Sequence, residues 1–403
     1  MIGLPEIEAA RAELRGSVVE TPCLPCRALA DDLGLDVWLK YENLQLTGSF
    51  KVRGALHKLR SLPEDVLARG IVAASAGNHA QGVAYAARET GAPATVVMPL
   101  TAPLVKIANT ERLGARAVLH GETFDDAYAE ACRLAASEGL TFIHPFEDER
   151  VIAGQGTIGL ELVEQVPELG AVVVPVGGGG LISGIATAVK ALRPEVKVYG
   201  VATEAAPASA ESFRTGSVVE RPSQRSVADG IAVKKPGELT FAHIRRSVDD
   251  LVTVSEEQIR KALFRLLEGC KTLAEGAAAV GVAALASGRL PELAGRRVAV
   301  VLSGGNIDVQ LLSRIIDLSL VQSHRLVRFR TGVPDRPGSL AELLKVIAAA
   351  GGNVVRVQHD RVFKHTGFWE AEVENTLETR GPEHVTDLHR TLRERGFHAE
   401  VLH

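Results

Sequence analysis

Short apolar runs alternate with helical patterns along most of the chain. Runs at 71–74, 94–99, 171–176, 196–202 and 296–302 are typical of buried strands, and segments with apolar residues at helical spacing lie between them. Strands that alternate with helices of this length predict parallel βαβ units with helices on both faces of a sheet. We therefore expect an α/β fold in which residues 55–150 form a compact, smaller subdomain.

The pattern changes near residue 320. Residues 325–332 alternate as a strand, a helix is expected up to residue 350, two strands follow, and a helix at 381–396 precedes a last strand. This βαββαβ order is that of a ferredoxin-like unit. We expect a catalytic domain at 1–320, a hinge near Gln322 and Ser323, and a separate domain at 325–403.

One lysine stands out in the stretch YENLQLTGSFKVRGA. Lys51 lies where a polar, turn-rich segment gives way to a helical pattern. Unpaired N–H groups at a helix start disfavour an ammonium ion, and a lysine with a lowered pKa is suited to Schiff-base chemistry. A solvated surface lysine is the alternative.

Three turns follow the ends of apolar strands. The glycine run 177–180 opens a helix and is suited to bind a phosphate, although it matches neither a dinucleotide fingerprint nor a Walker loop. SAGNH places Ser75, Asn78 and His79 beside another helix start, and SGGN carries Ser303. Open parallel sheets bind ligands at this edge, so we expect the three turns to meet. Each turn could also serve backbone geometry alone.

Composition excludes several classes of protein. The 403 residues are 46% hydrophobic and 23% charged, and the net charge of −4 provides no positive field for nucleic acid or anionic membrane. The first residues lack a signal-peptide pattern, and four cysteines predict a cytoplasmic protein without a disulfide framework. Cys23 and Cys26 form a CxxC motif, for which we favour a structural role, and Cys132 and Cys270 stand apart.

The stretches YENLQLTGSFKVRGA, SAGNHAQGVAYAA, VIAGQGTIGLE, PVGGGGLISG and LSGGNID resemble the pyridoxal-phosphate enzymes of the tryptophan synthase β fold (fold type II), and more narrowly the threonine/serine dehydratases. The likeness covers residues 10–320. It implies two parallel-sheet αβα subdomains and pyridoxal 5'-phosphate as cofactor. The tail resembles an ACT domain, with DRPGSL as its motif.

The resemblance also implies roles for individual residues. Lys51 is the Schiff-base lysine and general base, Phe50 covers one face of the ring, and Gly230 leaves room at the other. Asn78 bonds the ring hydroxyl, Ser303 faces the pyridine nitrogen, and Ser75, Asn78 and His79 bind the substrate carboxylate. The phosphate is held by Gly177, Gly178, Gly179, Gly180 and Leu181.

The implied reaction is the conversion of L-threonine to 2-oxobutanoate and ammonia, as the first step of isoleucine synthesis. An ACT domain implies an amino-acid effector, with isoleucine favoured, bound near Pro337, Gly338 and Asn353, and a homo-oligomer, either a dimer or a tetramer. A dimerisation domain without a ligand is the alternative.

Other activities stay open. A serine-preferring or catabolic dehydratase fits almost as well, and a non-catalytic amino-acid sensor or a β-replacement synthase fits less well. Ala76 replaces the serine of related serine racemases, so racemisation should be slow. Ala202 replaces the glutamate with which their divalent-metal site begins, so we expect no such metal site.

Overall fold

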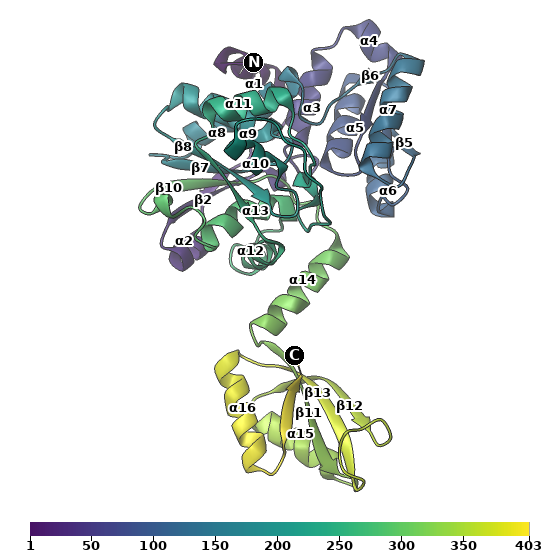
Figure 1. Ribbon diagram of the computed structural model, residues 1–403, viewed down its shortest axis with the longest axis vertical. Coiled ribbons are helices and arrows are strands. Elements are labelled where there is room, and N and C mark those ends of the chain that lie inside the picture. Colours follow the sequence, from purple (N-terminus) through teal and green to yellow (C-terminus); the bar gives the residue numbers. More distant parts are fainter. Residues whose placement is uncertain (403) are drawn as a thin grey trace. The chain divides into compact units, whose positions relative to one another are not determined.

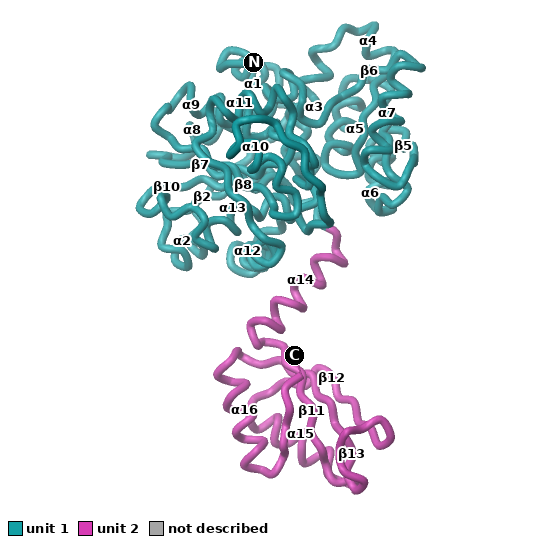
Figure 2. Tube along the Cα trace, viewed as in Figure 1, with its two compact units in different colours: residues 1–307 teal, residues 308–403 magenta. Residues whose placement is uncertain are grey.

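The computed structural model describes residues 1–402 and forms two compact units, residues 1–307 and 308–403 (Figure 2). The first unit contains one mainly parallel and one fully parallel sheet, and the second contains one antiparallel sheet. This arrangement confirms the expected fold class. The expected domain limits, 1–320, 55–150 and 325–403, stay predictions.

The larger sheet of the first unit has six strands in the order β1-β2-β10-β7-β8-β9, and only the β1–β2 pair is antiparallel (Figure 1). The strands are β1 (Cys23–Pro25), β2 (Asp36–Tyr41), β7 (Ala171–Pro175), β8 (Lys197–Thr203), β9 (Asp250–Val254) and β10 (Arg297–Leu302). All five residues of β7 are buried. A strand covered on both faces is apolar throughout, which explains its continuous apolar run.

Helices cover this sheet on both faces. Val172 and Val174 of β7 share a core cluster with residues of α8 (Glu149–Gln165) and α9 (Gly180–Leu192). Val173, which points to the other face, lies against Gly281 of α13 (Gly276–Ala286), where an added Cβ would approach its Cγ1 within 3.3 Å. The period of two along a strand therefore divides these valines between two helical layers.

Glycines in the motif VIAGQGTIGLE allow α8 and α9 to approach each other closely. A Cβ at Gly156 would lie 3.1 Å from the carbonyl oxygen of Gly184, and a Cβ at Gly184 would lie 2.5 Å from the amide nitrogen of Gly156. Side chains would not fit at this crossing. The glycines of this motif thus serve the packing of α8 against α9.

The smaller sheet is fully parallel, with the order β5-β4-β3-β6. Its strands are β3 (Ile71–Ala74), β4 (Ala94–Met98), β5 (Arg116–Leu119) and β6 (Thr141–Phe142). The helices of this region are α3 (Lys51–Arg60), α4 (Glu64–Arg69), α5 (Asn78–Thr90), α6 (Leu104–Arg112) and α7 (Phe124–Glu138). Gly91 ends α5 in a left-handed conformation with φ 71°, which is typical of a glycine that follows the last turn of a helix.

The polar sequence of residues 203–250 predicts an irregular segment, and this prediction is wrong in part. This segment contains α10 (Ala208–Thr215), the short 3-10 helix η2 (Asp229–Ile231) and α11 (Glu238–Ser247). Thr240, Phe241 and Ile244 of α11 are buried, but one turn of apolar spacing is too little to predict a helix. The other elements are α1 (Leu4–Leu14), α2 (Arg27–Leu33), η1 (Glu42–Leu44), α12 (Glu256–Glu268) and η3 (Pro291–Leu293).

The second unit begins with helix α14 (Val309–Gln322) and continues in the βαββαβ order that was expected. Its sheet is antiparallel, in the order β12-β13-β11-β14, and a buried cluster that includes Phe329, Leu343 and Leu388 joins it to the helices. The elements are β11 (Leu326–Pro334), α15 (Ser339–Ala349), β12 (Asn353–Asp360), β13 (Glu370–Glu378), α16 (Pro382–Glu394) and β14 (Ala399–Leu402). Within residues 1–402, no helix is long and apolar enough to cross a membrane.

Candidate active site

Lys51 is the first residue of α3, as the sequence predicted. Its Nζ donates a hydrogen bond to the carbonyl oxygen of Pro145 at 2.8 Å and lies 5.2 Å from the centre of the Phe50 ring. Burial lowers the pKa of Lys51 to about 8, and the negative charge of Glu275 opposes part of this shift. The direction agrees with the prediction, but burial causes it, rather than the helix start.

A buried ion cluster fixes the helix that carries Lys51. Arg53, the third residue of α3, pairs with Glu42 at 2.8 Å and with Glu161 of α8 at 2.5 Å. Lys40 pairs with the other oxygen of Glu161 at 2.5 Å. Two cations and two carboxylates balance their charges away from water, and they join the first turn of α3 to η1 and to α8.

The glycine loop 177–180 joins β7 to α9. Gly179 has φ 96°, a conformation that favours glycine, and a Cβ at Gly178 would lie 2.3 Å from the ring of Phe146. The N–H groups of Gly180 and Leu181 lie in the first turn of α9, where a helix provides no acceptor of its own. Several free N–H donors at the positive end of a helix suit a phosphate dianion, so this loop fits the phosphate of pyridoxal phosphate.

Lys51 and the glycine loop contact adjacent residues of one segment. Pro145, whose carbonyl accepts the bond from Lys51, precedes Phe146, which packs against both Gly178 and Gly180. The structure thus brings together an amine and an anion-binding loop from distant parts of the chain. These are the two groups that an aldehyde cofactor with a phosphate requires.

The turns SAGNH and SGGN meet through side-chain amides. The Nδ2 of Asn306 donates to the Oδ1 of Asn78 at 2.8 Å. The Nδ2 of Asn78 donates to both carboxylate oxygens of Glu275, at 2.7 and 2.9 Å. Burial raises the pKa of Glu275 to about 7, although the bonds from Asn78 act in the opposite direction.

Sequence reasoning missed Glu275. The residue occupies the N-cap of α13, and its backbone N–H donates to the carbonyl of Gly304 at 3.0 Å. An acidic residue immediately before an alanine-rich helix is an ordinary capping signal. Nothing in that signal reveals that the carboxylate faces Asn78.

Gly230 lies beside this carboxylate group, and Ser303 directly precedes Gly304, where an added Cβ would be 2.5 Å from Glu275 Oε1. Ser303 follows β10, is buried, and accepts a hydrogen bond on its carbonyl oxygen from the N–H of Phe50 at 3.1 Å. Gly230 lies in η2, where an added Cβ would be 3.7 Å from Glu275 Oε1 and 3.2 Å from the Cβ of Ala277. Their roles toward the cofactor ring stay predictions.

Ser75 and His79 lie at the start of α5. The hydroxyl of Ser75 accepts a bond from the N–H of Gly77 at 3.1 Å. The Nε2 of His79 lies 2.9 Å from the carbonyl oxygen of Ile143, and burial together with the charge of Lys51 lowers the pKa of His79 to about 3. The ring of His79 is therefore neutral and donates to the backbone, so its backbone N–H is the donor available to a substrate. The substrate-binding role of His79 stays a prediction.

The cysteines are arranged differently from the sequence reading. The sulfur of Cys26 lies 2.9 Å from that of Cys270, so Cys270 does not stand alone. Cys23 and Cys26 are both buried, and Cys132 is exposed. Among residues 1–402, no group of three or more His, Cys, Asp or Glu side chains could hold a metal ion.

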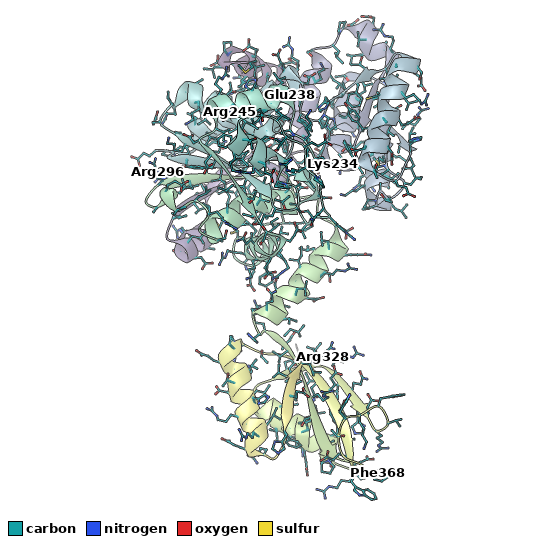
Figure 3. All side chains as sticks on the ribbon, viewed as in Figure 1. Lys234, Glu238, Arg245, Arg296, Arg328 and Phe368 are labelled. Carbon is teal, nitrogen blue, oxygen red and sulfur yellow. The ribbon has the colours of Figure 1, made fainter. Side chains whose placement is uncertain are left out.

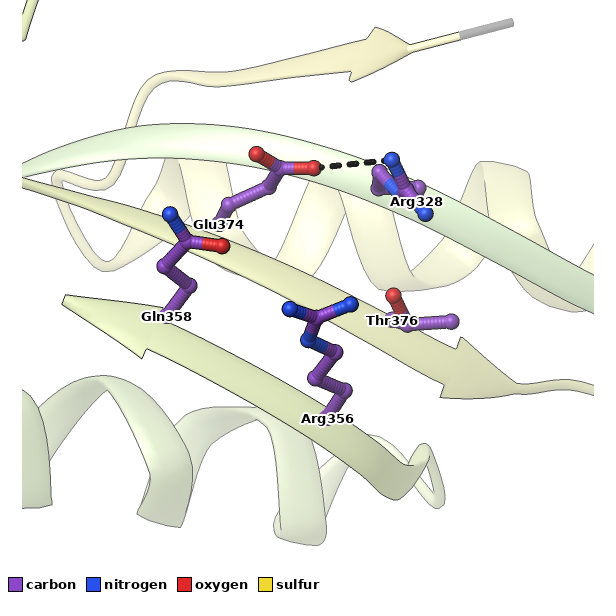
Figure 4. A pocket seen from close by; sticks show the side chains of 5 residues that line it. All are labelled: Arg328, Arg356, Gln358, Glu374 and Thr376. Atoms are coloured by element: carbon purple, nitrogen blue, oxygen red, sulfur yellow. Dashed lines mark ion pairs between the residues drawn. The ribbon is translucent and has the colours of Figure 1, made fainter.

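The open face of the sheet in the second unit carries a shallow polar pocket (Figure 4). Arg328 of β11 pairs with Glu374 of β13 at 3.2 Å, and Arg356 of β12 extends beside them. Gln358 and Thr376 complete the lining. Both signs of charge are therefore presented next to each other.

Comparisons with known proteins agree with this geometry. The model of the family described as "Pyridoxal-phosphate dependent enzyme" matches residues 14–304, and that of the ACT domain matches residues 327–394. An L-threonine ammonia-lyase of Thermotoga maritima is 49% identical over 402 residues, which is 100% of both chains.

A catabolic L-threonine dehydratase of Escherichia coli is 42% identical over 78% of this chain and 96% of its own. The solved structure of processed threonine deaminase isoform 2 from Solanum lycopersicum matches with a TM-score of 0.75 and 37% identity, over 78% of this chain and 92% of that one. The chain is thus similar to these proteins in both sequence and fold.

Proposed function

We propose that this chain, which belongs to the family of pyridoxal-phosphate dependent enzymes, is an L-threonine ammonia-lyase that forms 2-oxobutanoate and ammonia. The observation that carries the proposal is Lys51, an amine with a pKa near 8 that bonds to Pro145, the residue before the phenylalanine that packs on the glycine loop. The full-length similarity to the Thermotoga maritima enzyme supports the choice of substrate.

We assign the proton transfer at the substrate Cα to Lys51. A pKa of about 8 leaves part of this amine uncharged near neutral pH, which suits a general base. When bound, pyridoxal phosphate supplies a ring that accepts electrons from Cα and so favours loss of the β-hydroxyl group.

The remaining site residues bind and orient the cofactor and the substrate. Residues 177–181 hold the phosphate, Asn78 contacts the ring hydroxyl, and Phe50 excludes water from one face of the ring. Ser303 donates a hydrogen bond to the pyridine nitrogen, while Ser75, Asn78 and the backbone of His79 hold the substrate carboxylate. Two sets of contacts support these assignments: those of Asn78 with Asn306 and Glu275, and those of Phe146, next to the carbonyl that Lys51 binds, with the glycine loop.

Regulation by an amino acid is the second part of the proposal. The ACT match supports it, and isoleucine is the effector that we favour for an enzyme at the start of isoleucine synthesis. Gly338 caps α15 with φ 96°, and Asn353 begins β12, where its side chain donates to Glu378 at 2.7 Å. The neighbourhood of Pro337, Gly338 and Asn353 stays our proposed effector site.

A catabolic or serine-preferring dehydratase is the main alternative. The Escherichia coli catabolic relative matches 78% of this chain, whereas the Thermotoga maritima relative matches all of it, including the ACT domain. This difference favours the regulated enzyme.

One assay tests these proposals. Keto-acid formation is measured from L-threonine and from L-serine, with and without isoleucine, valine or leucine. We expect L-threonine to be preferred and isoleucine to inhibit. Absence of keto acid from both substrates would contradict the activity, and absence of any response to the three effectors would contradict the regulation.

We also propose a homo-oligomer. The β12–β13 hairpin tip exposes Val362, Phe363, Phe368 and Trp369, each at 80% or more, and Phe368 projects from the end of the second unit (Figure 3). Large apolar side chains gathered on one tip favour contact with another protein surface. Light scattering of the full chain should give a multiple of 42.8 kDa, and a monomeric mass would contradict this.

A further inference from the structure

Two thiols that are far apart in the sequence of the first unit lie next to each other beside helix α2. The sulfur atoms of Cys26 and Cys270 lie 2.9 Å apart, although 244 positions separate them in the chain. Cys26 caps the start of α2, and Cys270 follows the end of α12. An ion pair between Asp32 and Arg265 at 3.1 Å links the same two helices.

The segment that follows Cys270 leads directly to the active site. The carbonyl of Leu273 accepts a hydrogen bond from the Nδ2 of Asn43 at 2.9 Å. Glu275, five residues after Cys270, bonds to Gly304 through its backbone and to Asn78 through its carboxylate. A covalent link at Cys270 would therefore hold one end of the segment 270–275, whose other end is Glu275, the residue that orients Asn78.

We propose that Cys26 and Cys270 are a reversible modification site, at which thiol–disulfide exchange forms one bridge that secures the segment 270–275. A disulfide has sulfur atoms about 2.05 Å apart, so the two thiols need only a small approach. The CxxC pair of Cys23 and Cys26 is then not the reacting pair.

The oxidant is a low-molecular-weight disulfide. The thiolate of Cys270, which is the less buried of the two, attacks one sulfur of the disulfide, forms a mixed disulfide and expels one thiolate. The thiolate of Cys26 then attacks the sulfur of Cys270 and expels the second thiolate. The two expelled thiolates take up the protons that the cysteines lose, so two protein thiols and one disulfide give one protein bridge and two small thiols.

The rate should rise with pH. Burial, with a further contribution from Cys26, raises the pKa of the Cys270 thiol to about 12. Because only the thiolate attacks, exchange is slow at neutral pH and faster in alkaline buffer.

The test uses the full chain with its cofactor and an excess of glutathione disulfide at about pH 8.5, where the thiolate fraction is raised. Remaining thiols are alkylated and the digested protein is examined by mass spectrometry. We expect a joined peptide pair containing Cys26 and Cys270, glutathione on the exposed Cys132, and full reversal by dithiothreitol. Alkylation of both Cys26 and Cys270, or a bridge between Cys23 and Cys26, would overturn the proposal.

Two variants provide controls. Cys132→Ser, at an exposed position outside the site, should retain the bridge, whereas Cys270→Ser should lose it. Oxidised wild-type protein should lose activity on heating more slowly than reduced protein, and the two treatments should coincide in Cys270→Ser. Equal rates for the two forms of the wild type would show that the bridge does not secure the segment.

Discussion

The side-chain amide of Asn78 donates hydrogen bonds to both carboxylate oxygens of Glu275, at 2.7 and 2.9 Å. Asn306 donates to the oxygen of the same amide at 2.8 Å, so the amide plane of Asn78 is fixed from both sides. Loops that follow β3 and β10 are joined in this way to the start of α13. Glu275 thus acts as a positioning residue for Asn78.

Glu275 should give the enzyme a pH dependence near neutrality. The pKa of about 7 means that the carboxyl is protonated as the pH falls below 7, and a protonated carboxyl is a weaker acceptor for Asn78. We expect kcat/KM to fall on the acid side of this pKa. In Glu275→Gln, kcat/KM should be about tenfold lower and this transition should be absent.

Glu89→Gln, an exposed change on α5, is the control and should retain the wild-type pH profile. The same pKa shift predicts the sign for stability. Because the folded state holds a proton that the unfolded state releases, stability should fall as the pH rises from about 4.5 to about 7. If the fall in kcat/KM near pH 7 persists unchanged in Glu275→Gln, that fall belongs to another group.

Gly178→Ala should weaken cofactor binding. The added Cβ would lie 2.3 Å from the ring of Phe146, so the loop must shift and its N–H groups lose their alignment. We expect the dissociation constant for pyridoxal phosphate to rise at least about tenfold in a titration of the apoenzyme. Gly367→Ala, where the nearest atom is 3.7 Å away, is the matched control. Equal affinity in Gly178→Ala would argue against a phosphate site in this loop.

Arg53→Leu should destabilise the first unit strongly. Removal of the guanidinium leaves Glu42 and Glu161 buried with only Lys40 to balance them. The expected loss is about 3–5 kcal/mol in the free energy of unfolding, measured by urea denaturation. Arg88→Leu, at an exposed position, should change it by no more than about 0.5 kcal/mol. A similarly small loss for Arg53→Leu would show that the cluster contributes little.

Ser303→Asp should change the product ratio. A carboxylate at this buried position would hold a proton on the pyridine nitrogen, which strengthens electron withdrawal by the ring. We expect slower elimination, measured as 2-oxobutanoate from L-threonine, and more transamination, measured as the aminated form of the cofactor. An unchanged ratio would remove Ser303 from the pyridine nitrogen.

The sequence predicted most elements because local patterns determine them. The buried run at 71–74, the glycine after α5 and the glycine run before α9 all mark structures that a short segment specifies by itself. The βαββαβ order of the second unit was confirmed for the same reason.

Contacts between residues far apart in the sequence could not be predicted from local patterns. Glu275 looks like a helix cap, and its contact with Asn78 spans 197 positions. Cys270 looks isolated until the fold places it beside Cys26. The lowered pKa of Lys51 was expected from its helix start, but its cause is burial, which depends on residues supplied by other segments.

The identity of the reactive lysine tests the central claim most directly. The purified enzyme with its cofactor is reduced with borohydride, which fixes pyridoxal phosphate to the lysine that carries it, and the digested protein is mapped by mass spectrometry. We predict the modification on Lys51 alone, and in Lys51→Ala neither the modification nor turnover of L-threonine. Attachment to another lysine, or turnover that survives in Lys51→Ala, would contradict the account.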